Sequence, residues 1–100
     1  MFKNKFVTIG IQSEVPIELV HLIFEEIDKL VKSGKEVDYL QVFDIKVIEP
    51  KIGLIEITHS QEVPEYEVSI FVDGVNLVED LKIFVMDEND NATMMLAWEY

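Results

Sequence analysis

Residues 16–32 read PIELVHLIFEEIDKLVK, a pattern typical of one long amphipathic helix. Apolar residues recur at spacings of three and four, which places them on one stripe about five turns long. They are Val20, Ile23, Phe24, Ile27, Leu30 and Val31. Pro16 suits the first turn, Glu18 suits the positive end of the helix dipole, and Gly34 can supply a left-handed C-cap. The sequence therefore predicts a helix that buries one face against another layer.

On both sides of this helix the apolar period changes to two, which is typical of strands. The predicted strands are residues 6–11, 43–47, 55–58, 66–72, 81–87 and 92–99. Residues 49–53 predict a turn, and the polar run 87–91 predicts a five-residue connection between the last two strands. The stretch 75–80 shows neither period. The predicted fold class is α+β, with one long amphipathic helix packed on a mainly antiparallel, curved sheet of about five to six strands.

Length and composition predict a single domain over residues 1–100. The chain has 100 residues, 49% of them apolar, which is enough for one core. It contains no Cys, so a disulfide scaffold is excluded, although a Cys-free composition does not itself define a compartment. The first residues lack the pattern of a signal peptide, and no uncharged run approaches the roughly 20 residues that span a bilayer. We expect a cytoplasmic protein.

The charge balance narrows the classes of partner. Twenty acidic residues against eight basic ones give a net charge of −12, and every basic residue is Lys. A phosphate backbone or an anionic membrane surface would be repelled, so we expect neither nucleic-acid nor membrane binding. A basic or apolar protein surface is the expected partner. A nucleic-acid mimic, in which carboxylates imitate phosphates and occupy a basic protein, is an alternative.

The width of the predicted sheet points to a protein partner. Six strands about 4.8 Å apart span roughly 25 Å, whereas one helix covers a band of about 10 Å. The closing hairpin is apolar on both faces, as expected for strands that are covered on both sides. Its second face could be covered by residues 75–80 and the termini, or by another protein. The candidate interface residues are Phe84, Met86, Met95 and Trp98.

The candidate chemistry centres on His59. Alternation from Ile55 and Ile57 places this residue on the apolar face of its strand, where a buried structural histidine is the commoner outcome. A small hydrolase or ligand-binding protein with a site near His59 and Tyr66 is the alternative function. Ser60 cannot pair with His59, because neighbouring residues of a strand point to opposite faces. The sequence predicts no catalytic residue, no cofactor and no metal ligand set.

Four stretches resemble one known family. They are DYLQVF at 38–43, HSQEVPEY at 59–66, KIFVMD at 82–87 and TMMLAWEY at 93–100. Together they are similar to the domain-of-unknown-function nine-sixty (DUF960) family, small uncharacterised proteins of Gram-positive bacteria. The resemblance implies a stand-alone domain and brings no activity, cofactor or site residue. Charge and the doubly apolar hairpin therefore carry the leading hypothesis, a non-enzymatic protein-interaction or regulatory module that self-associates as a homodimer.

Overall fold

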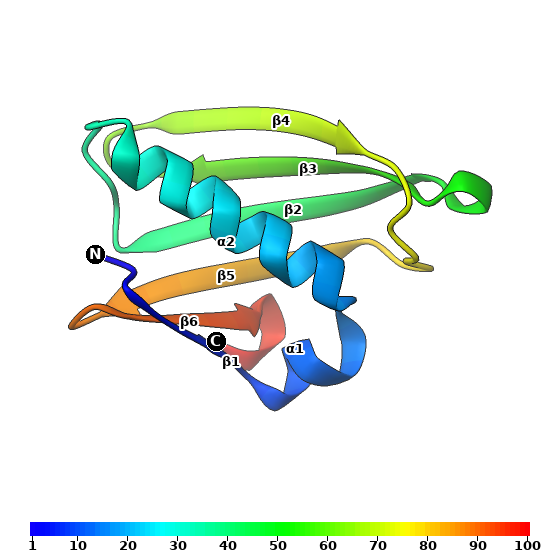
Figure 1. Cartoon of the computed structure of the whole chain (residues 1–100), viewed down its shortest axis with the longest axis horizontal. Coiled ribbons are helices and arrows are strands. Elements are labelled where there is room, and N and C mark those ends of the chain that lie inside the picture. Colours follow the sequence, from blue (N-terminus) through cyan, green and yellow to red (C-terminus); the bar gives the residue numbers. More distant parts are fainter.

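Two helices, two short 3-10 helices and one six-stranded sheet make up the computed structural model, which describes residues 1–100 (Figure 1). The elements are β1 (Asn4–Val7), α1 (Ile9–Glu14), α2 (Ile17–Lys32), β2 (Leu40–Glu49), η1 (Pro50–Ile52), β3 (Leu54–Gln61), β4 (Tyr66–Val72), β5 (Leu81–Glu88), β6 (Asn91–Leu96) and η2 (Ala97–Glu99). The strand order is β1-β6-β5-β2-β3-β4. Only β1 and β6 pair in parallel, so the sheet is mixed but mostly antiparallel. The predicted α+β class is confirmed.

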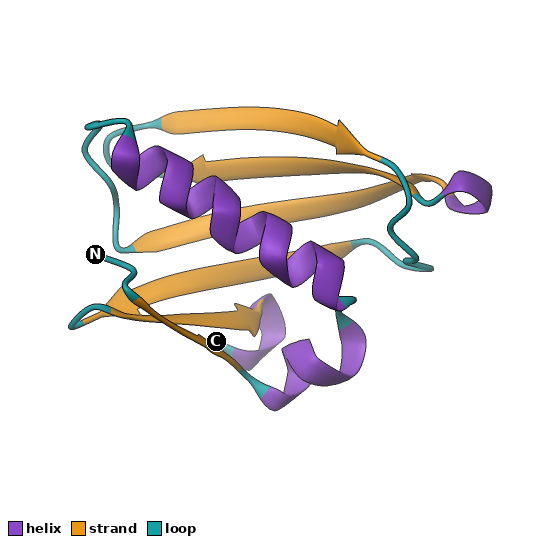
Figure 2. Ribbon diagram, viewed as in Figure 1, coloured by secondary structure: helices purple, strands orange, loops and turns teal.

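Helix α2 lies obliquely across one face of the sheet, with its C-terminal end beside the start of β4 (Figures 1 and 2). Pro16 is the N-cap, one residue before the first turn in which it was predicted, whereas Gly34 adopts a φ of +80° just after the helix ends, as predicted. The buried side of the helix faces the sheet. It consists of Leu19, Val20, Ile23, Phe24, Ile27 and Leu30.

The predicted first strand over residues 6–11 was wrong from Thr8 onward. Strand β1 ends at Val7, and the Thr8 side chain accepts a hydrogen bond from the Ile11 backbone N–H at 3.3 Å, which starts helix α1. Ile11 and Val15 are four residues apart and both buried, while Ile9, the first residue of α1, is exposed. Alternating apolar residues over so short a run fit either period, and the Thr8 cap decides between them.

The closing hairpin is tighter and shorter than predicted. β5 extends to Glu88 and β6 begins at Asn91, so the connection is the two-residue turn Asn89–Asp90, not five residues. Both turn residues have positive φ, 53° and 66°, which Asn and Asp tolerate and which matches the twist of paired strands. At the other end β6 stops at Leu96, and η2 replaces the last predicted strand residues.

The chain itself widens the cover over the helix side of the sheet. Besides α2, the core cluster on this side includes Phe2, Ile11 of α1 and its C-cap Val15, and Val75 and Leu77 of the β4–β5 connection. The Val75 N–H donates to the Gly53 carbonyl at 3.0 Å. A Cβ at Gly53 would lie 2.7 Å from the Val75 nitrogen, so this close approach of two loops requires glycine. The segment 75–80 therefore completes the helix side and does not cover the opposite face.

Candidate functional site

The sheet face opposite α2, called the open face here, carries a contiguous apolar patch. Its side chains alternate with the buried ones along β1, β6, β5 and β2. Cross-strand register joins them: Met86 lies opposite Leu40, and Phe84 lies opposite both Val42 and Met95. Phe6 on the edge strand is 53% exposed, and the strand residues beside it are half-buried. The open-face patch consists of Phe6, Leu40, Val42, Phe84, Met86, Met95 and Tyr100.

The structure brings three of the four predicted interface residues together on this patch. Phe84, Met86 and Met95 share the open face of the paired strands β5 and β6, which have strand neighbours on both sides. Trp98 is not on a strand, because η2 begins at Ala97, and its side chain is 76% exposed. None of the four is buried within the subunit. Whether they form an interface stays a prediction.

A hydrogen-bonded latch holds η2 against α1. The Glu99 Oε1 atom accepts from the Thr8 hydroxyl at 2.7 Å and from the Leu96 backbone N–H at 2.8 Å. These bonds, led by the one from Thr8, hold the pKa of Glu99 below its usual value. The latch sets the position of Tyr100, whose ring meets the Phe84 ring edge-on with centroids 5.5 Å apart. The end of η2 is thus the one helical element that reaches the open face.

The rest of the open face is mostly polar, although β4 also carries the exposed Phe71 opposite Glu56. On β3 and β4 the hydroxyls of Thr58 and Ser69 lie 2.9 Å apart. Along the border with the open-face patch, Lys82 lies opposite Asp44 at 3.9 Å, and Lys46 lies opposite Glu56. These two lysines and two carboxylates cancel in charge, in a chain whose net charge is −12. The patch therefore borders a neutral strip.

On the helix side, His59 is 2% exposed and belongs to a buried polar network. Its Nε2 lies 2.6 Å from Gln41 Oε1. The Gln41 amide nitrogen donates to the Asp38 carbonyl at 2.8 Å and to Gln61 Oε1 at 2.9 Å. Because a carbonyl oxygen only accepts, this arrangement makes Nε2 of His59 the donor toward Gln41. The network fixes one tautomer of the ring.

Aromatic rings complete the surroundings of His59. The Phe43 ring stacks on it with centroids 4.3 Å apart, and the Tyr66 ring meets it edge-on at 5.5 Å. Burial lowers the pKa of His59 from 6.5 to about 4, so the imidazole is neutral near pH 7. A cavity of about 290 Å³ reaches this ring and Tyr66 from solvent, between the C-terminal end of α2 and strands β3 and β4. The structure thus brings the two predicted ligand-site residues to one cavity.

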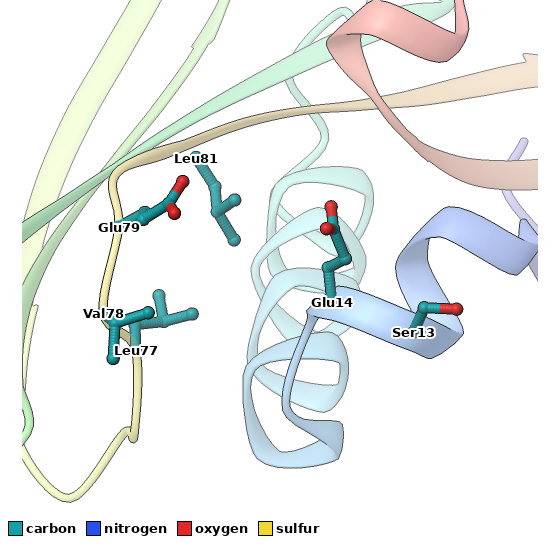
Figure 3. Close-up of a pocket in the computed structure, with 6 residues that line it drawn as sticks. All are labelled: Ser13, Glu14, Leu77, Val78, Glu79 and Leu81. Carbon is teal, nitrogen blue, oxygen red and sulfur yellow. The ribbon is translucent and has the colours of Figure 1, made fainter.

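A second cavity, of about 240 Å³, lies between α1 and the segment before β5 (Figure 3). Ser13 and Glu14 line it from α1, and Glu79 lines it from the opposite wall together with Leu77, Val78 and Leu81. No histidine or lysine lines it that could act as a base or neutralise the two carboxylates. No three His, Asp or Glu side chains anywhere in the chain are placed to hold a metal ion together. This cavity supports no specific chemistry.

Sequence reasoning missed the polar partners of His59 and four of the seven members of the open-face patch, namely Phe6, Leu40, Val42 and Tyr100. Gln41 and Gln61 lie an even number of residues from the buried Phe43 and Ile57 on their strands, so they point to the same buried face. This alternation was the available signal for the two partners. Leu40 and Val42 alternate in the same way with buried neighbours, but their pairing with β5 is not visible in the sequence. The contact of Tyr100 with Phe84 depends on the η2 turn.

The carboxylates are spread over the molecule. They occur on α1, α2, the loops and strands β2, β3, β4 and β5, and on both sides of the sheet, while β1 and β6 carry none. This distribution presents no single acidic row, so nothing in the fold favours a nucleic-acid mimic. None of the helices combines the length and apolar character that crossing a membrane requires.

Comparison with known proteins gives a family and a fold. The family described as "Staphylococcal protein of unknown function (DUF960)" matches residues 4–99. A crystal structure of a protein of unknown function from Enterococcus faecalis matches with a TM-score of 0.84 and 23% identity, covering 98% of this chain and 91% of that one. At this identity the likeness shows the shared fold alone. No curated protein matches the chain.

Proposed function

This chain belongs to the DUF960 family, which brings no activity with it, and from that premise we propose that it is a non-enzymatic interaction module that self-associates through the open-face patch. The observation that carries the proposal is the patch itself, six apolar or aromatic strand residues together with Tyr100, on a sheet face that neither α1 nor α2 covers. Contiguous apolar surfaces of this kind mark interaction sites in soluble proteins.

Charge favours a second copy as the occupant. A molecule of net charge −12 repels its own copies, except through a surface that carries no net charge. The patch has no side-chain carboxylate among its members, and the border strip pairs Lys82 with Asp44 and Lys46 with Glu56. A two-fold axis places the same surface on both subunits, so each lysine can meet a carboxylate of the other copy.

The dimensions of the open face suit a dimer. Six strands about 4.8 Å apart, with β5 eight residues long, give a flat area of roughly 600 Å². This area does not include the additional surface of the protruding side chains. A stable interface takes about 800 Å² from each partner. The face can therefore supply most of one interface without any rearrangement of the chain.

Sedimentation velocity across the micromolar range tests the proposal. We expect a concentration-dependent dimer for the wild type and at least about a hundredfold weaker association for Phe84→Asp, because a symmetric contact would bury the added charge twice. The matched control is Asn76→Asp, which adds the same charge to an exposed residue of the β4–β5 connection, off the open face, and should associate like the wild type.

A second variant tests the same surface in case Phe84→Asp fails to fold. Trp98→Ser changes a largely exposed side chain beside the patch, so the fold should persist while association weakens. The proposal is overturned by a wild type that stays monomeric throughout the range, or by Phe84→Asp and Asn76→Asp that associate equally.

A further inference from the structure

His59 has a nitrogen whose hydrogen-bonding capacity the protein leaves unused. Its Nε2 donates to Gln41, so in the neutral ring Nδ1 carries a lone pair and can only accept. Nδ1 has no hydrogen-bond partner in the chain. No side-chain nitrogen or oxygen is both sealed from solvent and unpartnered, so Nδ1 must reach the 290 Å³ cavity that His59 lines. A nearly buried acceptor is therefore aimed into a cavity.

The lining of this cavity is positively charged. Its lining contains two lysines, Lys29 and Lys35, and one carboxylate, that of Glu26. The Glu26 carboxylate lies 3.2 Å from Lys29 Nζ. Lys35 makes no ion pair, and its ammonium lies 5.3 Å from the centre of the Tyr66 ring. The chain has twenty acidic and eight basic residues, so a cavity lined by the unpaired Lys35 ammonium differs from the acidic character of the whole molecule. It favours an anion.

The walls between these two polar points are apolar. Leu30 lies on the α2 side, and Val68, Ile70 and the Tyr66 ring lie on the β4 side. The centre of the Tyr66 ring lies 5.5 Å from the centre of the His59 imidazole and 5.3 Å from the Lys35 ammonium. One small molecule that lies along the Tyr66 ring can therefore reach both groups. Ser33 also lines the cavity, but its hydroxyl already donates to the Leu30 carbonyl at 2.6 Å, so its proton is engaged within the chain.

We propose that this cavity binds a small organic acid whose carboxylate pairs with Lys35 and whose O–H or N–H group, at the far end of an apolar body, donates to Nδ1 of His59. The cavity lies on the helix side of the sheet, away from the open-face patch, so binding does not depend on self-association. Its volume is at the lower end of small-molecule pockets, which restricts the ligand to a compact molecule.

NMR titration of the full chain tests the proposal with three matched probes. 4-Hydroxybenzoate carries both recognised groups, benzoate lacks the donor, and 4-hydroxybenzamide lacks the charge. We expect saturable shifts of the Leu30, Lys35 and Tyr66 amides with the first probe, and about tenfold weaker binding of the other two. The ¹⁵N resonance of His59 Nδ1 should also shift, while Nε2 stays protonated.

Lys35→Gln provides the variant, and Lys32→Gln, an exposed lysine that does not line the cavity, is its matched control. We expect the first to weaken 4-hydroxybenzoate binding about tenfold and the second to leave it unchanged. Equal binding of 4-hydroxybenzoate and benzoate, wild-type binding by Lys35→Gln, or the absence of saturable shifts with every probe each overturns the proposal.

Discussion

Successive residues of the same strands point alternately to the sheet face beneath α2 and to the open face, yet the chain covers only the first of these two faces. Beneath α2, outside the cavity that His59 lines, the core is closed to solvent, and no sealed side-chain nitrogen or oxygen lacks a partner, as in the network of His59, Gln41 and Gln61. On the open face, Asp44 and Lys82 pair at 3.9 Å and stay half-exposed. The difference indicates which apolar groups stabilise the monomer and which remain available to a partner.

The largest expected effect separates two phenylalanines. Phe43 is fully buried and stacked on His59, so Phe43→Ala should lower the free energy of unfolding by about 3–5 kcal/mol. Phe84 on the open face is half-buried, and Phe84→Ala should cost no more than about 1.5 kcal/mol. Urea unfolding of both variants at low protein concentration measures the contrast. Equal losses would mean that the open face supports the subunit as much as the covered face does.

Acid should destabilise the covered face through His59. The folded-state pKa of about 4 lies below the unfolded value of 6.5, so between these values the unfolded chain binds the proton and the folded chain does not. Stability from this group is therefore complete above pH 6.5 and falls, by roughly 3 kcal/mol, as the pH drops toward 4. Urea unfolding from pH 7 to pH 4 measures it.

Two histidine variants separate this effect from the titration of carboxylates. His59→Gln should show a flatter pH profile between 6.5 and 4, whereas His21→Gln, which changes an exposed residue of α2, should keep the wild-type profile. A His59→Gln profile as steep as that of the wild type would assign the acid sensitivity to other groups.

Hydrogen bonds on the two faces should also differ in strength. Gln41→Leu removes the acceptor of the buried His59 Nε2–H and should cost about 2 kcal/mol. Thr58→Val removes the more exposed bond to Ser69 and should change stability by less than about 0.5 kcal/mol. Chemical denaturation of both variants gives the comparison, and equal costs would contradict it.

The latch between α1 and η2 should have a smaller effect. Thr8→Val removes the N-cap of α1 and the hydroxyl that donates to Glu99, at a cost of about 1 kcal/mol. Because η2 is then released, the fluorescence of Trp98 should also change. Thr93→Val, on the open face of β6, is the control that should alter neither quantity. Unchanged fluorescence in Thr8→Val would show that other contacts hold η2.

The smallest expected effect on the monomer is at Trp98. Its side chain is 76% exposed, so Trp98→Ala should change the free energy of unfolding by less than about 0.5 kcal/mol at concentrations where the chain is monomeric. The same variant should weaken self-association at higher concentration. A loss of several kcal/mol in the monomer would place Trp98 among the structural residues.

Short segments were the hardest to predict from the sequence. Residues 66–72 alternate over seven positions and form β4 with the predicted bounds, because a long run distinguishes a period of two from one of 3.6. Residues 6–11 are too few for that distinction, and the Thr8 cap turns them into a helix. The two-residue turn at Asn89–Asp90 depends on a register that only the pairing of β5 with β6 sets.

The amino-acid order alone determined the α2 stripe, the strands with regular alternation, the family and the excess of acidic over basic residues, since each depends on composition or on neighbours within a few residues. Tertiary structure decided what those faces meet. Strand order joins Phe6, Val42 and Phe84, which are far apart in the chain, into one patch, and it brings Lys35 to the cavity of His59. Pairing between distant strands and the oblique path of α2 arise from packing the whole chain at once, which no local pattern records.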